Sequence, residues 1–287
     1  MSGTGVQIVM MTATCPLPLQ SEILSCIGIT TGSCHIVHSP TDRPEIAYNV
    51  VLRDSIGLAK DALVELWERS VDMKKNDASF RGLVYCRSKT LVNEVATALG
   101  CKPFHADLSE EENAKTFKDW VDGRTKVIVA TSLLGCGIDV EGVGLVLHLG
   151  TPWSALDFAQ ESGRAGRGGR SSTSVVFASD NEWEPEGEDI YGAKTMRDWV
   201  LQKSACRRIA LSSFLDGGHT TCVTLPGGAL CDICRRESTQ EHPRQLVKFT
   251  APAIPDGDVP PPRKPLHVPP SSSTYELERS RHRERER

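Results

Sequence analysis

The densest group of chemically useful side chains lies in Gln160-Glu161-Ser162-Gly163-Arg164-Ala165-Gly166-Arg167-Gly168-Gly169. Arg164 and Arg167 stand three residues apart, which predicts two guanidinium groups on one helical face. Guanidinium groups are planar, permanently charged donor forks that suit a polyphosphate. The interleaved glycines leave room for neighbouring backbone to approach closely. Composition alone fits a glycine-rich surface loop with solvated arginines equally well, so the position of the segment in the fold decides between the two interpretations.

Three predicted strands bring hydroxyls, glycines and charge to one rim of a sheet. The strand at 126–131 runs into Ser132 and onward to Asp139, 144–149 runs into Gly150-Thr151-Pro152, and 82–86 runs into Arg87-Ser88-Lys89-Thr90. Ligands of parallel α/β sheets bind at the carboxyl ends of strands, where helix N-termini hold phosphate oxygens. This position favours a phosphate-binding surface. Ser88 and Ser132, taken singly, are equally ordinary helix N-caps.

A cluster of cysteines that ends in C-x-x-C predicts a metal site. Its members are Cys206, Cys222, Cys231 and Cys234. Four thiolates form a closed tetrahedral site for a structural Zn²⁺. The alternative is two buried free thiols and two surface ones, but a polar, glycine-rich segment is a poor place to bury thiols. The remaining cysteines are predicted to be small buried side chains in a reducing compartment: Cys15, Cys26, Cys34, Cys86, Cys101 and Cys136.

The segments that must position these residues alternate between strand and helix. Apolar strands rich in Val, Ile and Leu are predicted at 46–52, 82–86, 126–131, 144–149 and 174–178. Helices are predicted at 18–26, around 62–67, at 91–99 before Gly100, and from a capping box at Ser109 and Glu112 to Gly123. A short helical module is predicted at 195–236. Such alternation indicates a parallel α/β layer.

Composition limits the classes of function. The net charge is -4, from 33 basic and 37 acidic residues, so any contact with nucleic acid must come from local geometry rather than from a global positive field. No apolar run is long enough for a transmembrane helix, and residues 1–11 lack the basic flank and cleavage site of a signal peptide. Residues 181–190 hold five acidic side chains and no basic one, which predicts a surface loop.

In their order along the chain, these segments resemble the second motor domain of superfamily 2 helicases. The residues 82–88 resemble motif IV, 104–108 the box that follows it, 129–139 motif V, 160–167 motif VI, and Met11-Thr12-Ala13-Thr14 motif III of the first motor domain. Within that superfamily the chain most resembles the RecQ family of DNA helicases, because of the residues that make up motif VI and the cysteine cluster that follows it in the sequence. Gly168, Leu134 and Cys136 depart from the usual RecQ residues, which are Asp, Phe and Met.

The resemblance implies an enzyme that couples ATP hydrolysis to 3′-to-5′ unwinding of duplex DNA, with ATP and Mg²⁺ held between two RecA-like lobes. It implies that Arg167 is an arginine finger on the γ-phosphate, supported by Arg164 and Gln160. Gly137, Asp139 and Gly163 would line the nucleotide cleft together with both arginines. Ser88, His105 and Thr131 would lie near the DNA backbone, and the four clustered cysteines would hold Zn²⁺. The implied partners are junctions of single-stranded and duplex DNA, with no membrane, and the implied setting is DNA repair and recombination, in the nucleus if the source is eukaryotic.

Two parts of such a motor are missing from the sequence. There is no G-x-x-x-x-G-K-[ST] phosphate loop and no Asp-Glu box ahead of residue 11. The chain is therefore expected to lack the first lobe and to be inactive alone. One alternative is a non-enzymatic module that binds nucleic acid or protein and derives from a helicase. Another is half of an RNA helicase, against which the cysteine cluster argues.

The expected fold is a RecA-like parallel α/β domain, followed by a small helical zinc-binding module and a disordered tail. The expected organisation is a remnant of the first lobe at 1–38, the helicase C-terminal domain at 40–180, the zinc module at 195–240 and the tail at 241–287. The tail is assigned as disordered because residues 251–270 hold eight of the 17 prolines and the last residues alternate Arg and Glu.

Overall fold

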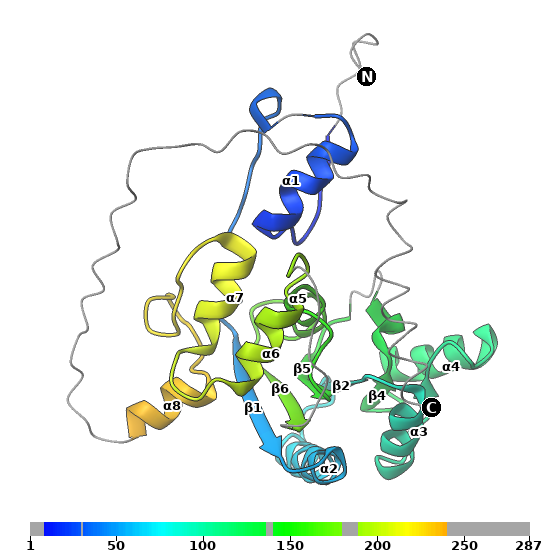
Figure 1. Ribbon diagram of the computed structural model, residues 1–287. Helices are drawn as coiled ribbons and strands as arrows, with labels where there is room; N and C mark the ends of the chain where they lie inside the picture. The colour runs from blue at the N-terminus through cyan, green and yellow to red at the C-terminus, as the bar shows by residue number, and fades with distance from the viewer. Residues whose placement is uncertain (1–8, 30, 136–139, 180–188, 240–287) are drawn as a thin grey trace. The chain divides into compact units, whose positions relative to one another are not determined.

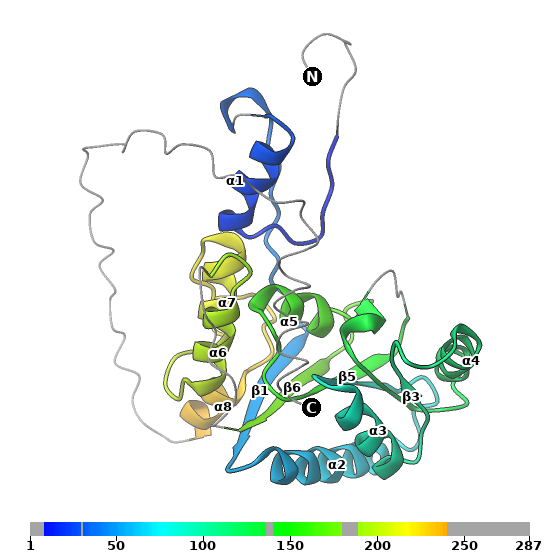
Figure 2. The same ribbon diagram turned by 45° about the vertical axis from the view of Figure 1, so that its right-hand side comes forward.

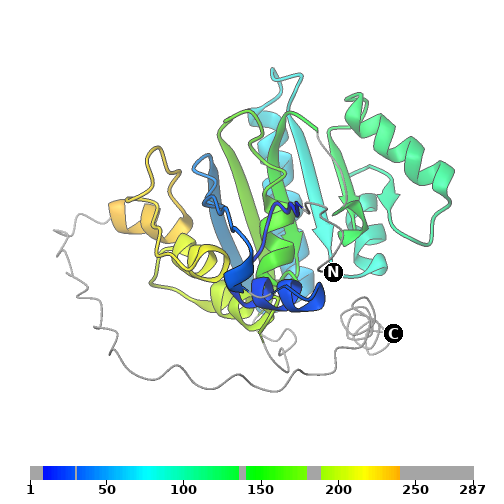
Figure 3. The same cartoon turned by 90° about the horizontal axis from the view of Figure 1, so that it is seen from above.

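The computed structural model describes residues 9–29, 31–135, 140–179 and 189–239. Their strands form one parallel sheet in the order β1-β6-β5-β2-β4-β3, seen side by side in Figure 3. The strands are β1 (Ile46–Arg53), β2 (Arg81–Cys86), β3 (Pro103–Phe104), β4 (Val127–Ala130), β5 (Val143–Leu149) and β6 (Ser172–Ser179). The predicted RecA-like parallel α/β fold is confirmed. The five strands predicted from apolar runs are present, and the two-residue β3 is an addition.

Eight helices are described between and beyond these strands (Figure 1). They are α1 (Leu17–Cys26), α2 (Ile56–Met73), α3 (Lys89–Ala98), α4 (Glu110–Val121), α5 (Ala155–Ser162), α6 (Ala193–Leu201), α7 (Arg207–Asp216) and α8 (Asp232–Thr239), with short 3₁₀ turns at Thr31–Ser33 and Ser132–Gly135. Serine side chains accept a backbone N–H at the start of α2, α3, α4 and α5. The capping box of Ser109 and Glu112 is confirmed at α4.

The central strands are buried on both faces, which explains their unbroken apolar sequences. In β2, Leu83 and Tyr85 enter one core, while Val84 and Cys86 enter the other, because side chains alternate along a strand. Figure 2 shows α2 and α3 on one side of the sheet and α5, α6 and α7 on the other. The sheet is therefore a rigid layer that fixes the loops at its strand ends.

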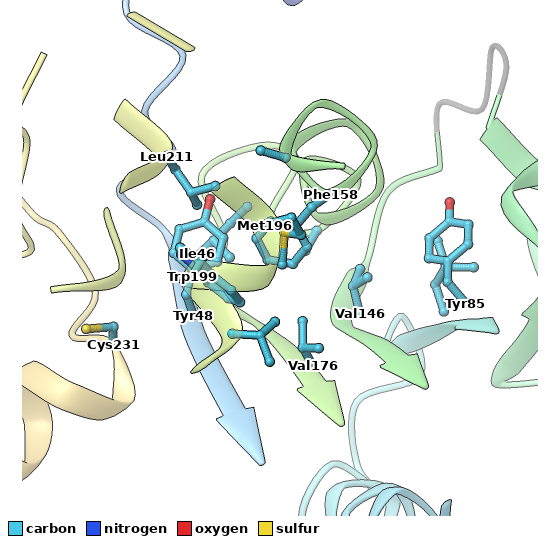
Figure 4. Packing of buried hydrophobic residues seen from close by; sticks show 14 of the residues in the cluster. Ile46, Tyr48, Tyr85, Val146, Phe158, Val176, Met196, Trp199, Leu211 and Cys231 are labelled. Atoms are coloured by element: carbon cyan, nitrogen blue, oxygen red, sulfur yellow. The ribbon is translucent and has the colours of Figure 1, made fainter. Parts of the chain in front are cut away.

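An aromatic cluster fixes α5 against the sheet and against α6 (Figure 4). The ring of Phe158 in α5 lies 4.7 Å from Trp199 of α6 and 5.8 Å from Tyr48 of β1, centroid to centroid. Trp199 meets Tyr48 edge-on at 6.4 Å. Tilted and edge-on geometries are the favourable ones for such pairs. Because α5 leads directly into the arginine segment, this cluster sets where that segment begins.

One sequence-based prediction, that of the scattered cysteines, needs correction. Of the six scattered cysteines, Cys86 is buried in β2, but Cys26 is exposed at the end of α1. Cys15, Cys34 and Cys101 are half-buried in loops, and Cys136 lies outside the described residues.

Other predictions fall on parts of the chain that are not described. These are most of the acidic segment at 181–190 and the tail at 241–287. The predicted domain boundaries stay a prediction. Among the described helices, none is both long and apolar enough to cross a membrane.

Candidate functional site

The arginine segment is a chain of turns, not a helical face. Helix α5 ends at Ser162, and Gly163 closes it by donating its N–H to the Ala159 carbonyl at 2.9 Å. Gly166 then adopts φ +70°, which an α-helix does not accommodate. Arg164 and Arg167 are therefore presented from a turn, and the prediction of a shared helical face was wrong. Gly166 contacts Val143 and Ser172, the first residues of β5 and β6, so this part of the segment lies at the amino ends of these strands and not at the rim formed by the carboxyl ends.

Close approach explains a glycine in this turn. A Cβ atom on Gly166 would lie 2.5 Å from Cγ of Glu45 and 2.6 Å from Oγ of Ser172. The Gly166 N–H donates to the Val143 carbonyl at 3.0 Å, which ties the turn to β5. The prediction that these glycines let backbone come close is confirmed here by the Arg170 carbonyl oxygen, 2.9 Å from that Cβ position, although the two nearest atoms belong to side chains.

A buried polar cluster lies beneath the arginine turn. Nε2 of His148 in β5 lies 3.2 Å from Oε2 of Glu161, and both side chains are buried. Tyr85 of β2 stacks on His148 with ring centroids 5.5 Å apart. Burial raises the pKa of Tyr85, and the Glu161 carboxylate adds to this, while the nearby Arg164 guanidinium acts in the opposite sense. Arg164 is 7% exposed, so its charge belongs to this buried cluster.

Arg43, in the linker before β1, holds the turn from outside. Its Nη1 donates to the Gly163 carbonyl at 2.6 Å and its Nη2 to the Ala165 carbonyl at 2.8 Å. Its Nε donates to Oε1 of Glu45 at 2.6 Å. The two carbonyls flank Arg164, so one guanidinium fixes the peptide on each side of it. Sequence analysis missed Arg43 because an arginine in a linker carries no motif.

The remaining predicted motif VI residues are accessible. Gln160 is exposed, and its Nε2 donates to Oγ1 of Thr14 at 3.1 Å. Arg167 is half-buried. Thr14 belongs to the segment that resembles motif III, so the contact joins the two sequence motifs directly. Gly137 and Asp139 lie outside the described residues.

The three residues predicted near DNA lie just beyond the carboxyl ends of β2, β3 and β4. Thr131 follows β4 directly, His105 follows β3 directly, and Ser88 comes two residues after the end of β2. The Ser88 hydroxyl accepts the Leu91 N–H at 3.2 Å, so its N-cap role is confirmed. His105 is buried, and its Nε2 lies 3.0 Å from Oδ1 of Asn93.

The same rim of the sheet has a small hollow between β2 and β5. Arg87, Ser132, His148, Trp153 and Glu161 are among the residues that line it. The guanidinium carbon of Arg87 lies 4.0 Å from the ring centre of Trp153. A cation above an indole face is a favourable arrangement. The hollow thus joins the rim to the buried cluster below motif VI.

The four clustered cysteines come together as the sequence predicts. Cys206, Cys222, Cys231 and Cys234 are all buried, and their sulfur atoms lie within 4.8 Å of one another. Tetrahedral Zn²⁺ with bonds of about 2.3 Å places its sulfur ligands roughly 3.8 Å apart. Backbone N–H groups point at three of the sulfurs, at 3.3 Å for Cys206, 3.3 Å for Cys222 and 3.5 Å for Cys231. This is the donor arrangement that thiolate ligands need, so the residues fit a structural Zn²⁺.

The electrostatics of the cluster favour thiolates only in part. Hydrogen bonds from Cys206 and Cys222 hold the pKa of Cys231 below that of an ordinary thiol. The pKa of the Cys234 thiol is raised to about 12, and burial is the largest cause of this rise. A divalent cation would remove this conflict, because it stabilises all four thiolates together.

Several known proteins are similar to this chain. Residues 61–169 match the family described as helicase conserved C-terminal domain. A "Putative ATP-dependent DNA helicase Q1" of Caenorhabditis elegans is 28% identical over 224 residues, which are 74% of this chain and 34% of that protein. The "ATP-dependent DNA helicase hus2/rqh1" of Schizosaccharomyces pombe is 26% identical over 270 residues, which are 87% of this chain and 19% of that protein. Among solved structures, Dbp5 L327V of S. cerevisiae with RNA and ADP BeF3 has a TM-score of 0.48 at 17% identity, over 63% of this chain and 46% of that one.

Residues 61–169 are therefore similar to the C-terminal domain of helicases. Over most of its length the chain is similar to RecQ-type DNA helicases, the family that the motifs and the cysteine cluster resemble. It spans about a third or less of the length of these two relatives.

Proposed function

We propose that this chain is the second motor lobe, with its zinc module, of a RecQ-type helicase that unwinds duplex DNA in the 3′-to-5′ direction by hydrolysing ATP. The observation that carries the proposal is the contact of Gln160 with Thr14, at 3.1 Å between Nε2 and Oγ1. It joins motif VI to the segment that resembles motif III of the first lobe. A motif VI that meets first-lobe sequence is oriented toward the cleft in which the nucleotide would lie.

In this proposal the arginine turn acts on the nucleotide. ATP with Mg²⁺ would supply the phosphoryl group that is transferred to water. Arg167, half-buried on a turn fixed to β5, would stabilise the charge that develops on that group. The buried Arg164 and the exposed Gln160 would support it, and Gly137, Asp139 and Gly163 would line the cleft. A fixed turn suits this role, because a preorganised charge needs little reorganisation when the reaction occurs.

The rim of the sheet would carry the DNA. Ser88, His105 and Thr131 follow the carboxyl ends of β2, β3 and β4, which supports the proposal that they lie near one nucleic-acid backbone. His105 is buried, so direct contacts would come from the other two residues. Contacts of this kind are made to phosphate and sugar and are independent of sequence. Because the net charge of the chain is -4, binding would depend on this rim rather than on a general positive surface. The preferred substrate would be a junction of single-stranded and duplex DNA.

The cysteine cluster would hold one structural Zn²⁺. Its four ligands would be Cys206, Cys222, Cys231 and Cys234, which fit a closed tetrahedral site. If the source is eukaryotic, we place the protein in the nucleus, in DNA repair or recombination.

The experiment supplies a phosphate loop, a motif that the 287 residues do not contain. We would fuse a RecQ first lobe ahead of Met1 and measure ATP hydrolysis with and without DNA. The fusion should show DNA-stimulated ATPase, and Arg167→Ala should lower turnover by about 10³-fold to 10⁵-fold while nucleotide binding is largely kept. Arg170→Ala is the matched control, because Arg170 is exposed and donates to Oγ of Ser79 outside the motif. Equal turnover of the two variants would refute the role of Arg167.

A second candidate is a non-enzymatic module, derived from a helicase, that binds nucleic acid or protein. The two candidates separate in the unfused chain and in the fusion. We expect no ATP hydrolysis by the unfused chain. A fusion that binds junction DNA with the same affinity as the unfused chain but does not hydrolyse ATP would support the non-enzymatic binding module. Single-stranded RNA tested beside the DNA junction would show whether the chain belongs to an RNA helicase instead.

A further inference from the structure

The zinc module and the arginine turn are connected by one continuous path of hydrogen bonds. The path starts at Arg208, two residues after the ligand Cys206 and 1% exposed. Its Nη1 donates to the Arg43 carbonyl at 3.0 Å, and its Nη2 donates to the Ile46 carbonyl at 2.7 Å. The same Nη2 lies 3.3 Å from the Ala229 carbonyl, in the loop between Cys222 and Cys231. One buried guanidinium thus binds the linker before β1 and the cysteine loop at the same time.

A backbone hydrogen bond also joins the loop between Cys222 and Cys231 to that linker. The Ala229 N–H donates to the Pro44 carbonyl at 2.7 Å. The linker is therefore bound from the metal module on two successive residues, Arg43 and Pro44. Its position depends on the module because the Arg208 side chain holds the Arg43 carbonyl and the Ala229 N–H holds the Pro44 carbonyl.

The other end of the path is the turn of motif VI. The side chain of Arg43 reaches the carbonyls of Gly163 and Ala165, at 2.6 Å and 2.8 Å. Glu45 orients that side chain through Nε, and the Glu45 carbonyl accepts the Ser172 N–H at 3.0 Å. The backbone of Arg43 is held by the module while its side chain holds the turn. A displacement of the linker is thus transmitted to the peptides on both sides of Arg164.

We propose that Arg208 and Arg43 are positioning residues, through which the metal-bound module fixes the motif VI turn and with it Arg164 and Arg167. This inference rests on the proposed function for the roles of the metal and of the two arginines. It assigns the module a second task besides holding its own fold. Loss of the metal would loosen the arginine turn even where the sheet stays folded.

The test is backbone amide exchange of the full chain, together with its metal content. The N–H groups of Gly163, Arg164, Ala165 and Gly166 are bonded to carbonyls of the described structure, so their exchange reports opening of the turn. Arg43→Lys and Arg208→Lys should raise this exchange about tenfold or more, because an ammonium cannot bridge two carbonyls as a planar fork does. Exchange in β2 and β5 should change less than twofold, and the zinc content should stay at one per chain.

Arg207→Lys is the matched control. Arg207 is the neighbour of Arg208 on α7, and its guanidinium pairs with Asp232, at 2.9 Å and 3.0 Å, and donates to the Trp199 carbonyl of α6, so it joins the module to α6 rather than to the linker before β1. This substitution should leave exchange of the turn within twofold. Removal of zinc by a chelator should raise exchange of the turn before that of β2 and β5.

Several results would refute the proposal that Arg208 and Arg43 position the motif VI turn. They are unchanged exchange of the turn in Arg43→Lys, an equal rise in Arg207→Lys, or a uniform rise over the whole sheet in Arg208→Lys. Chelation that removes zinc without affecting the turn would also refute it. Failure of the zinc proposal is a separate result, because it appears as wild-type protein that binds no zinc. In that case Arg43→Lys still tests the contact with the turn.

Discussion

Replacing Trp199 by Phe tests how the sheet and the cysteine module are joined. The ring of Trp199 is fully buried, and it packs on Phe158 and Tyr48 in the aromatic cluster. Its Nε1 donates to the carbonyl of Arg207, the first residue of α7, at 2.8 Å. Phe keeps an aromatic ring in the cluster but removes this donor.

Two costs add in the variant. A buried carbonyl that loses its donor costs about 1–3 kcal/mol. The smaller ring loses apolar burial and leaves a small cavity, which costs about 1–2 kcal/mol more. The free energy of unfolding should therefore fall by about 2–5 kcal/mol. With a urea m-value of about 3 kcal/mol/M, the unfolding midpoint should fall by about 1 M.

The assay is urea unfolding followed by far-ultraviolet circular dichroism, with Trp67→Phe as the control. Trp67 lies in α2 and stacks on Phe80 with ring centroids 6.0 Å apart, in the other core. Its replacement removes ring volume alone and should cost about 1–2 kcal/mol. Equal costs for the two variants would refute the reasoning, because the hydrogen bond to Arg207 would then contribute nothing.

Three further predictions concern the metal, the pH dependence and the turn. Purified protein should carry one Zn²⁺ per chain by elemental analysis; Cys231→Ser should lose it, while Cys86→Ser, whose thiol lies in the sheet, should keep it. Burial raises the pKa of the Tyr48 hydroxyl from 10.0 to about 12. The neutral hydroxyl therefore contributes its full stability below pH 10, and this contribution is lost as the pH rises to 12. In urea unfolding measured at each pH, Tyr48→Phe should reduce the loss of unfolding free energy over this range by up to about 3 kcal/mol. Gly166→Ala should cost about 2–5 kcal/mol, from left-handed strain and a clash, whereas Gly168→Ala, also left-handed but with nothing within 4 Å, should cost about 1–2 kcal/mol; equal costs in thermal unfolding would contradict the close packing at Gly166.

The sequence predicts the sheet well because its strands are buried on both faces. Burial on both sides requires unbroken apolar runs, and such runs are visible without a structure. It predicts the cysteine cluster for a similar reason, since ligand spacing is a local property. The course of the arginine segment was mispredicted, because a spacing of three residues fits a helix and a series of turns alike. Only the position of Gly163 at the helix end distinguishes them.

Long-range partners were beyond reach of the sequence. Arg43 stands 120 residues from Gly163, and Arg208 stands 162 residues from Ile46. Nothing local marks an arginine that binds a distant carbonyl. His148 did carry a signal, because a titratable side chain inside an apolar strand needs a buried partner, here Glu161. Its partner could not have been named before the fold was known.

The order of the strands has a consequence for how copies of this protein avoid one another. A parallel sheet ends in two open edges, and an open edge offers unpaired backbone groups to a strand of any other chain. One edge is β3, which is only two residues long and gives little to pair with. The other is β1, eight residues long, and its first carbonyl is already taken by Arg208 while α8 packs against the strand. The cysteine module thus covers the long edge, and a protein in which this module unfolds would expose a template for aggregation.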